Sequence, residues 1–277
     1  MTEGTSGMAV GTPDPSLRGV VLRYEGFCER GVDPVTFREV ACTFVPIIID
    51  LDAGWTVAHQ QDAPLRLQSF VAGLTDAPVL VGHGGSAHCL QIDLTPLGAR
   101  RILGLPLSEL ANRCVPVEAV LGRGATDLVQ RIGEAHRWED RFALVDAMLL
   151  RRLDDAPAID PGVAWSLGRI AASGGRTAIG PLAEELGWSH RRLITRYRDA
   201  IGLPPKTVAR IVRFERALEL LRAGTELSAI AVDCGYFDQA HLCRDVRELS
   251  GLTPAALRAG VNSVQDQAAR PPLPFGA

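Results

Sequence analysis

Two groups of polar side chains in the last hundred residues have the chemistry to bind the edges of nucleic-acid bases. An arginine side chain can donate two hydrogen bonds to guanine O6 and N7, and a glutamine side chain can pair with adenine in the same way. The first group is Ser189, His190, Arg191, Arg192, Thr195 and Arg198, and the second is Gln239, His241, Arg244 and Arg247, with the small residue Ala240 among them as a further candidate for DNA contact. What these side chains could reach depends on the elements that carry them.

The segments that carry the two groups repeat one short pattern. In the first copy, apolar residues at helical spacing lead to Gly187, and Ser189 can then cap a second helix. In the second copy, a similar apolar run leads to Gly235, and Asp238 can cap the next helix. Glycine ends a helix readily because it adopts positive φ without strain. Each copy therefore predicts a helix-turn-helix.

The stretch between the two copies predicts a rigid spacer. Residues 207–222 carry apolar side chains at helical spacing. A helix of this length spans about 24 Å. Such a spacer could hold two recognition helices about one DNA turn, or about 34 Å, apart.

The two outer faces divide into residues expected to read bases and residues expected to position the protein. We expect base contacts in the major groove from His190, Arg191 and Thr195 in the first copy, and from Gln239, His241 and Arg244 in the second. Phosphate contacts, which position without specifying sequence, are expected from Arg192, Arg198 and Arg247.

This part of the chain resembles the AraC/XylS family of transcription regulators over about 100 residues, from near Pro161 to Ala259. The second copy carries the more specific similarity, at Ile230-Ala231, Cys234-Gly235-Tyr236, Asp238-Gln239, His241-Leu242, Arg244, Gly251, Thr253-Pro254 and Arg258. Residues 213–217 and 220–221 resemble the linker-helix motif. The resemblance implies a DNA-binding unit of seven helices in two subdomains, at the C-terminus of a ligand-responsive regulator.

Three positions depart from the family pattern. Thr195 stands where the first recognition helix often has arginine, and Arg196 follows one place later. Val208 replaces the usual aromatic residue before the linker helix, and Val246 replaces a usual phenylalanine. These departures concern the sequence preference of the first half more than DNA binding itself.

Charge and composition suit a folded protein with a basic C-terminal part. The 277 residues are 47% hydrophobic and 22% charged, with a net charge of −3. Residues 160–260 carry a net +3, and the remainder carries −6. This distribution has the sign expected of a nucleic-acid reader attached to an acidic partner domain.

The first 160 residues predict a small β domain followed by helices. Short apolar or alternating runs, separated by Gly and Pro, predict strands at residues 19–24, 37–43, 45–51, 65–74, 79–82 and 88–94. Helices are expected at residues 96–103, 106–112, 125–136 and 140–153. The predicted fold class is α+β, with a small N-terminal β-barrel and helical hairpin before an all-α domain. The family resemblance implies that the barrel is cupin-like and holds an effector.

The chain is expected to have five parts. A flexible tail (1–16) precedes a domain for sensing and possible dimerisation (17–153), a linker (154–161), the DNA-binding domain (162–260) and a disordered tail (261–277). The expected partners are double-stranded promoter DNA, an unknown small-molecule effector, and RNA polymerase if the protein activates transcription. The helical pair at residues 125–136 and 140–153 could form a homodimer, although packing within the domain explains it equally well. No secretion signal or membrane span is apparent, so a cytoplasmic location is expected.

The sequence leaves two alternative functions. The tandem helical corners could be a scaffold that docks another protein, although their arginine-bearing faces argue against it. A metal-dependent cupin enzyme would need clustered histidines, and His59, His83, His88 and Cys89 lack the usual His-x-His pair and a nearby glutamate. No catalytic residue, metal site or cofactor is therefore expected. The six cysteines form no Cys-x-x-Cys and are expected to be free thiols.

Overall fold

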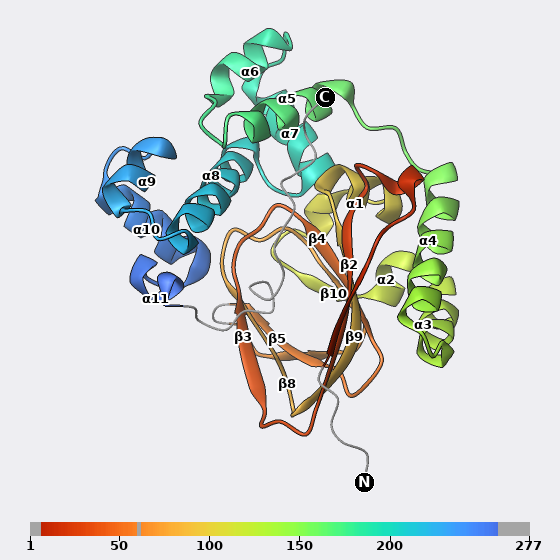
Figure 1. The fold of residues 1–277 in the computed structure, drawn as a ribbon. Coiled ribbons are helices and arrows are strands. Elements are labelled where there is room, and N and C mark those ends of the chain that lie inside the picture. Colours follow the sequence, from red (N-terminus) through yellow and green to blue (C-terminus); the bar gives the residue numbers. More distant parts are fainter. Residues whose placement is uncertain (1–6, 60–61, 260–277) are drawn as a thin grey trace.

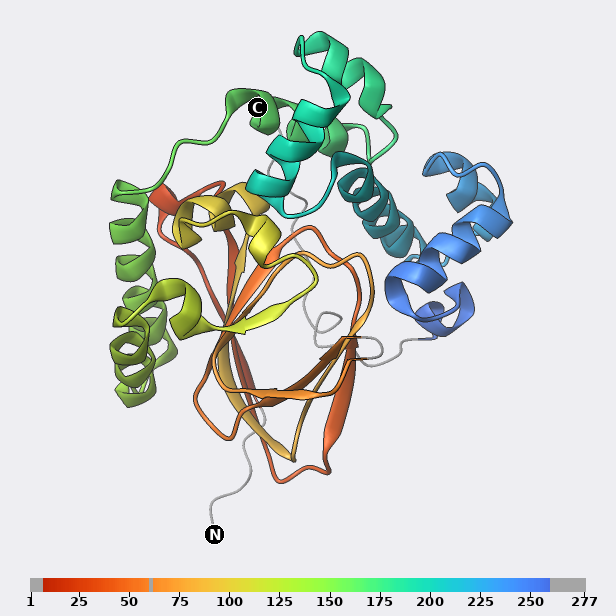
Figure 2. The ribbon, with the colours of Figure 1, turned by 180° about the vertical axis from the view of Figure 1, so that it is seen from behind.

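The computed structural model describes residues 7–59 and 62–259, which form a β domain with flanking helices followed by an all-helical C-terminal part (Figures 1 and 2). The order of elements agrees with the predicted α+β class. The predicted disordered tail, residues 261–277, lies outside the described residues.

The larger of two antiparallel sheets has the strand order β1-β2-β9-β4-β7-β10. Its strands are β1 (Gly7–Gly11), β2 (Val21–Arg30), β9 (Ser86–Leu94), β4 (Val45–Asp50), β7 (Phe70–Ala72) and β10 (Cys114–Pro116). Alternation along β4 directs Ile47 and Ile49 to one face and Ile48 to the other. Both faces of this sheet are therefore covered.

The smaller sheet has the strand order β3-β8-β5-β6 and covers one face of the larger. Its strands are β3 (Val35–Glu39), β8 (Val79–His83), β5 (Trp55–His59) and β6 (Leu65–Leu67). One apolar cluster joins Phe37 and Trp55 of this sheet to Ile48 and Phe70 of the other. The two sheets therefore face each other around a shared interior.

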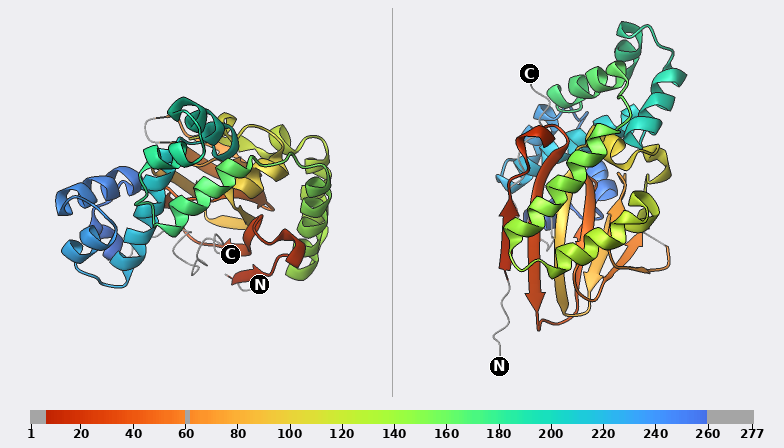
Figure 3. Two further views of the ribbon diagram at one scale, coloured as in Figure 1. Left: turned by 90° about the horizontal axis from the view of Figure 1, so that it is seen from above. Right: turned by 90° about the vertical axis from the view of Figure 1, so that its right-hand side faces the viewer.

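Helices cover the opposite face of the larger sheet. They are α1 (Pro96–Leu103), α2 (Val117–Leu121), α3 (Gly124–Glu134) and α4 (Trp138–Asp154), with the 3₁₀ helices η1 (Pro15–Leu17) and η2 (Leu107–Glu109). Figure 3 (right) shows α3 and α4 lying across this side of the domain. Phe142, Val145 and Leu149 of α4 join the same core as the sheet's Ile47 and Ile49.

Seven helices follow in the described part of the C-terminal half. They are α5 (Pro161–Ala172), α6 (Ile179–Glu185), α7 (His190–Ile201), α8 (Pro205–Arg222), α9 (Leu227–Asp233), α10 (Gln239–Ser250) and α11 (Pro254–Arg258). The long helix α8 contacts helices on both sides of it, including α5, α7, α9 and α10. Figure 1 shows it between the α5–α7 group and the α9–α11 group.

Several local expectations for the N-terminal half are corrected by the structure. The expected flexible tail is wrong for residues 7–11, because this segment pairs antiparallel with β2 as strand β1. The single strand expected at residues 65–74 is two strands in different sheets, β6 and β7. The helix expected at residues 106–112 is only the short turn η2. Strands β5 and β10 and helix α2 were not anticipated.

Within residues 7–59 and 62–259, no helix combines the length and the apolar character needed to cross a bilayer.

Candidate DNA-binding interface and adjoining cavity

The first predicted helix-turn-helix is formed by α6 and α7. Leu182 and Ala183 of α6 are buried against Leu193 and Tyr197 of α7. The turn contains Gly187 at φ 62°, a conformation that glycine adopts without strain. Ser189 caps α7, and its hydroxyl accepts the Arg192 N–H at 3.2 Å. The predicted turn and cap are confirmed.

The second helix-turn-helix, α9 and α10, repeats this geometry. Gly235 has φ 71°, and Asp238 caps α10 by accepting the His241 N–H at 2.6 Å. The Tyr236 N–H donates to the Ala231 carbonyl at 2.8 Å. In the first copy, the Trp188 N–H donates to the Ala183 carbonyl at the same distance. The two turns are therefore closed by equivalent backbone bonds.

The residues predicted to contact DNA lie on the solvent-facing sides of α7 and α10, the second helix of each helix-turn-helix. Those on or next to α7 are all exposed, as are four of the five on α10, whereas His241 is partly buried. Leu193 and Tyr197 of α7, and Leu242 and Val246 of α10, face the core instead. Each recognition helix thus presents one polar face.

Several of these polar side chains have partners within the protein. The Arg192 guanidinium lies over the Trp188 ring, 4.7 Å from its centroid. Thr195 donates its hydroxyl to the Arg191 carbonyl at 2.9 Å. Arg196, which follows the departure at Thr195, lies 3.6 Å from Asp160. Arg196 therefore contacts the residue that caps α5.

The spacer helix α8 holds the second turn in place. The Arg213 guanidinium lies 4.8 Å from the centroid of the Tyr236 ring and donates to the Gly235 carbonyl at 3.4 Å. Arg210 binds Asp245 of α10 at 2.7 Å. Because these contacts join α8 to the turn and to α10, the second recognition helix is fixed relative to α8.

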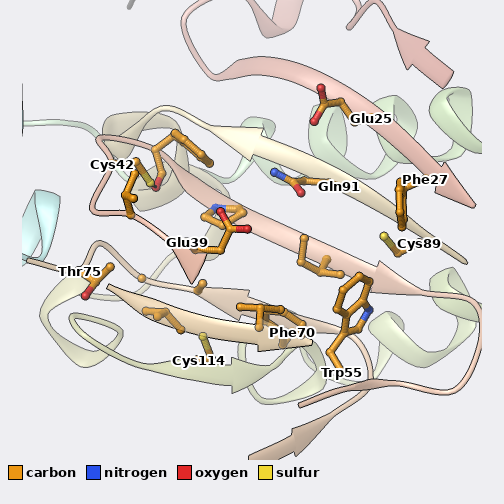
Figure 4. Close-up of a pocket in the computed structure, with 18 of the residues that line it drawn as sticks. Glu25, Phe27, Glu39, Cys42, Trp55, Phe70, Thr75, Cys89, Gln91 and Cys114 are labelled. Atoms are coloured by element: carbon orange, nitrogen blue, oxygen red, sulfur yellow. Dashed lines mark hydrogen bonds between the residues drawn. The ribbon is translucent and has the colours of Figure 1, made fainter. Parts of the chain in front are cut away.

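A cavity of about 100 Å³ lies between the two sheets (Figure 4). Its lining is mostly apolar and includes Ile48, Trp55 and Phe70. Burial raises the pKa of the Cys114 thiol to about 12, so this side chain lines the cavity as a neutral group. Burial also lowers the pKa of His59, which favours its neutral form.

Residues 40–44, between β3 and β4, connect the cavity to the helical C-terminal part. Val40, Cys42 and Phe44 line the cavity. The alternate residues face the other way, and the Ala41 N–H donates to the Leu249 carbonyl of α10 at 3.0 Å. Thr43 donates its N–H and its hydroxyl to the two carboxylate oxygens of Glu215 on α8, at 3.0 and 2.7 Å.

A second contact joins the two halves near α7. Arg100 of α1 lies 3.4 Å from the Asp199 carboxylate on α7. Gly202, which ends α7, lies so close to η2 that a Cβ there would be 3.0 Å from the Leu107 carbonyl oxygen. Each recognition helix is therefore in contact with the β domain at its C-terminal end.

The histidines considered for metal binding do not converge. His83 lies 3.3 Å from Glu29, with its ring against Trp55. His88 belongs to the larger sheet and points toward α4, where its Nε2 lies 2.8 Å from Arg141. His59 lines the cavity. Among the residues that the structure describes, no three His, Cys, Asp or Glu side chains are grouped as metal ligands.

The resemblance implied a β domain that holds an effector, but sequence reasoning missed the residues that line the cavity and the connection made by residues 40–44. Alternation along β4 and β9 was a usable signal, because Ile48 and Cys89 face the cavity while their neighbours face the helices. The contact between Thr43 and Glu215 joins residues 172 positions apart, and no sequence pattern marks it.

Residues 182–260 match a family model described as a helix-turn-helix domain. Among curated protein sequences, none matches this chain. Among solved structures, the chain is similar to ToxT from Vibrio cholerae, at 8% identity over 86% of this chain and 96% of that chain, with a TM-score of 0.49. It is also similar to a probable AraC family transcriptional regulator from Rhodopseudomonas palustris, at 28% identity over 36% of this chain and 96% of that chain, with a TM-score of 0.33.

The matched residues contain both helix-turn-helix units except the first three residues of α6. They include the spacer helix α8 and the signature-like run from Ile230 to Arg258. The C-terminal part of this chain is a helix-turn-helix domain, and it contains the residues at which the sequence resembles the AraC/XylS family of transcription regulators.

Proposed function

We propose that this chain is a sequence-specific transcription regulator that binds promoter DNA through α7 and α10 and responds to a small molecule bound in its β domain. The DNA-binding half rests on two capped helix-turn-helix units with exposed polar faces. The ligand-responsive half rests on one observation, which is that residues 40–44 have one side in a cavity and the other on the DNA-binding domain.

The proposed base readers are the residues whose side chains project from the exposed faces. They are His190, Arg191 and Thr195 on α7, and Gln239, His241 and Arg244 on α10. Arg192, Arg198 and Arg247 are proposed to bind phosphates. Ser189 and Ala240 lie at the N-terminal ends of the two recognition helices, where the backbone approaches the groove.

His241 has a specific geometry for this role. Its Nδ1 accepts the Phe237 N–H at 3.4 Å, and its ring packs edge-on against Tyr236. A neutral imidazole that accepts at Nδ1 carries its proton on Nε2. His241 is therefore proposed to donate from Nε2 to a base acceptor.

The effector is proposed to be a small, largely apolar molecule held between the two sheets. The cavity is lined mostly by aromatic, aliphatic and neutral thiol side chains, including Phe70 and Cys114, and its polar lining residues include Glu25, Glu39 and Gln91. A ligand that displaces Val40, Cys42 or Phe44 would shift Ala41 and Thr43 as well, because these residues alternate along one short segment. Their bonds to α10 and α8 would then change with occupancy.

The proposed domain limits follow the division between the β domain and the helical C-terminal part. Residues 17–153, extended by the strand at residues 7–11, are proposed to form the sensor domain. Residues 154–161 are proposed as the linker and residues 162–260 as the DNA-binding domain. A homodimer remains a proposal, as does contact with RNA polymerase if the protein is an activator.

Binding of the full chain to its own upstream DNA tests this function. Fluorescence anisotropy would compare that DNA with a scrambled sequence of equal composition at two salt concentrations. We expect a preference for the native sequence, and a steep loss of affinity with salt because bound phosphates release counterions. Equal binding to both sequences, with random-sequence DNA also yielding no preferred site, would contradict the proposal.

A further inference from the structure

The two helix-turn-helix units differ by one residue in the turn. In the first, a single residue, Trp188, separates Gly187 from the cap Ser189. In the second, two residues separate Gly235 from the cap Asp238. Trp188 and Tyr236 correspond, because both close their turns with the same backbone bond and both lie beneath an arginine. The additional residue is Phe237.

The Phe237 side chain contributes little to the turn itself. It is 92% exposed, the largest exposed fraction among the large hydrophobic side chains of the described residues. The corresponding turn in the first unit closes without such a residue. Exposure of a whole phenyl ring to water is unfavourable, so a surface that covers the ring when DNA is bound would gain free energy.

The Phe237 backbone is nevertheless well held. Its N–H donates to His241 Nδ1 at 3.4 Å, and the neighbouring Tyr236 ring packs between His241 and Arg213. Asp238, the next residue, caps α10. The ring is therefore presented from a fixed point at the N-terminal end of the second recognition helix, which is the end that contacts base edges in helix-turn-helix proteins.

We propose that Phe237 contacts the C5-methyl group of a thymine in the major groove at the second half of the operator. Apolar contact with this methyl group is the direct means by which a phenylalanine distinguishes thymine from other bases. Gln239, two residues away, has the amide that pairs with adenine. The second half-site is therefore expected to contain an A·T pair, or adjacent A·T pairs, opposite the start of α10. This inference rests on the proposed DNA-binding function.

The test removes the methyl group from the DNA and the ring from the protein. DNA sites would first be selected from a random pool with the full chain, and each thymine would then be replaced singly by deoxyuridine. At one position we expect wild-type affinity to fall about fourfold, which is the worth of one buried methyl group. Phe237→Ala should bind the original site more weakly and should lose its sensitivity to deoxyuridine at that position.

Val232→Ala is the matched control. Val232 lies on the first helix of the same unit, α9, and is 76% exposed. Val232→Ala should bind the selected DNA site with wild-type affinity. It should also lose affinity, as the wild type does, when the thymine is replaced by deoxyuridine. Phe237→Leu, which keeps an apolar side chain, should retain part of that effect. Both phenylalanine variants should fold normally because the ring is exposed.

The outcomes separate this inference from the function on which it rests. If no site is selected from the pool, the DNA-binding function is wrong. If a site is selected but every deoxyuridine substitution affects wild type and Phe237→Ala equally, the thymine contact is wrong. Unchanged DNA binding by Phe237→Ala would also overturn it, and would favour a protein partner for this ring.

Discussion

Arg244 and Arg247 project from the same helix and are both exposed, yet their removal should have different effects. Arg244→Ala should reduce specific DNA binding by about 5- to 150-fold, since one bidentate contact to a base distinguishes sequences by about 1–3 kcal/mol. Its effect on non-specific binding should be much smaller. Anisotropy titrations with the selected site and with scrambled DNA would measure both.

Arg247→Ala is the matched variant. Because a phosphate contact carries no sequence information, this change should weaken binding to both DNAs equally and reduce the salt dependence. Equal losses on both DNAs for Arg244→Ala would show that Arg244 does not read a base. Neither variant should alter thermal stability appreciably, because both side chains are exposed.

Gly235 is a residue whose backbone conformation sets the geometry of the second turn. Its φ of 71° is unfavourable for a β-branched residue, and an added Cβ would lie 3.0 Å from the Arg176 side chain. We expect Gly235→Val to lower the free energy of unfolding by about 1–3 kcal/mol. Thermal unfolding followed by circular dichroism would detect the loss.

Gly235→Asn is the control for that change, because asparagine tolerates positive φ far better than valine does. Gly235→Asn should lower the free energy of unfolding by clearly less than Gly235→Val does. A valine variant that melts at the wild-type temperature would mean that the turn does not depend on glycine.

At the scale of elements, residues 40–44 are the proposed connection between cavity and DNA-binding domain. Thr43→Val removes the hydroxyl that donates to Glu215, leaving a partly buried carboxylate oxygen with one partner fewer. A lost hydrogen bond of this kind costs about 1–3 kcal/mol. We expect the amides of residues 40–44 to exchange with deuterium faster, as measured by mass spectrometry of the full chain.

Thr36→Val provides the control, since Thr36 is exposed on the adjoining strand β3. It should leave the exchange of residues 40–44 unchanged. Wild-type exchange rates in Thr43→Val would mean that the hydroxyl does not stabilise this connection.

The elements also differ in how well the sequence predicts them. The two helix-turn-helix units were predicted with their turns and caps, because glycine at positive φ and a capping side chain act within a few residues. The split of residues 65–74 into two strands was not predictable locally. It occurs next to Ser69, whose hydroxyl accepts the Asp50 N–H at 3.0 Å from another strand.

The residues that line the cavity, and the contacts of residues 40–44, were not predicted for the same reason. They arise where two sheets face each other, and their lining comes from strands distant in sequence. Strands β1 and β10 are five and three residues long and lie at the two edges of the larger sheet. Segments this short carry little periodic signal, and their pairing partners determine their structure.

At the scale of the whole molecule, α8 sets the distance between the two recognition helices, α7 and α10. Its 18 residues span about 27 Å, and it packs against helices of both units. Insertion of five base pairs between the two half-sites would turn the second half-site to the opposite side of the DNA. We expect affinity to fall to that of a single half-site. Unchanged affinity in the same anisotropy assay would mean that only one unit reads the DNA.

The packing of α4 on the larger sheet depends on two glycines. A Cβ on Gly11 of β1 would lie 2.5 Å from the Phe142 ring, and a Cβ on Gly26 of β2 would meet the Trp138 ring still more closely. The two rings stack on each other, with centroids 5.9 Å apart. Across evolution, these four positions should therefore covary. Relatives that gain a side chain at either glycine should carry smaller residues at positions 138 and 142.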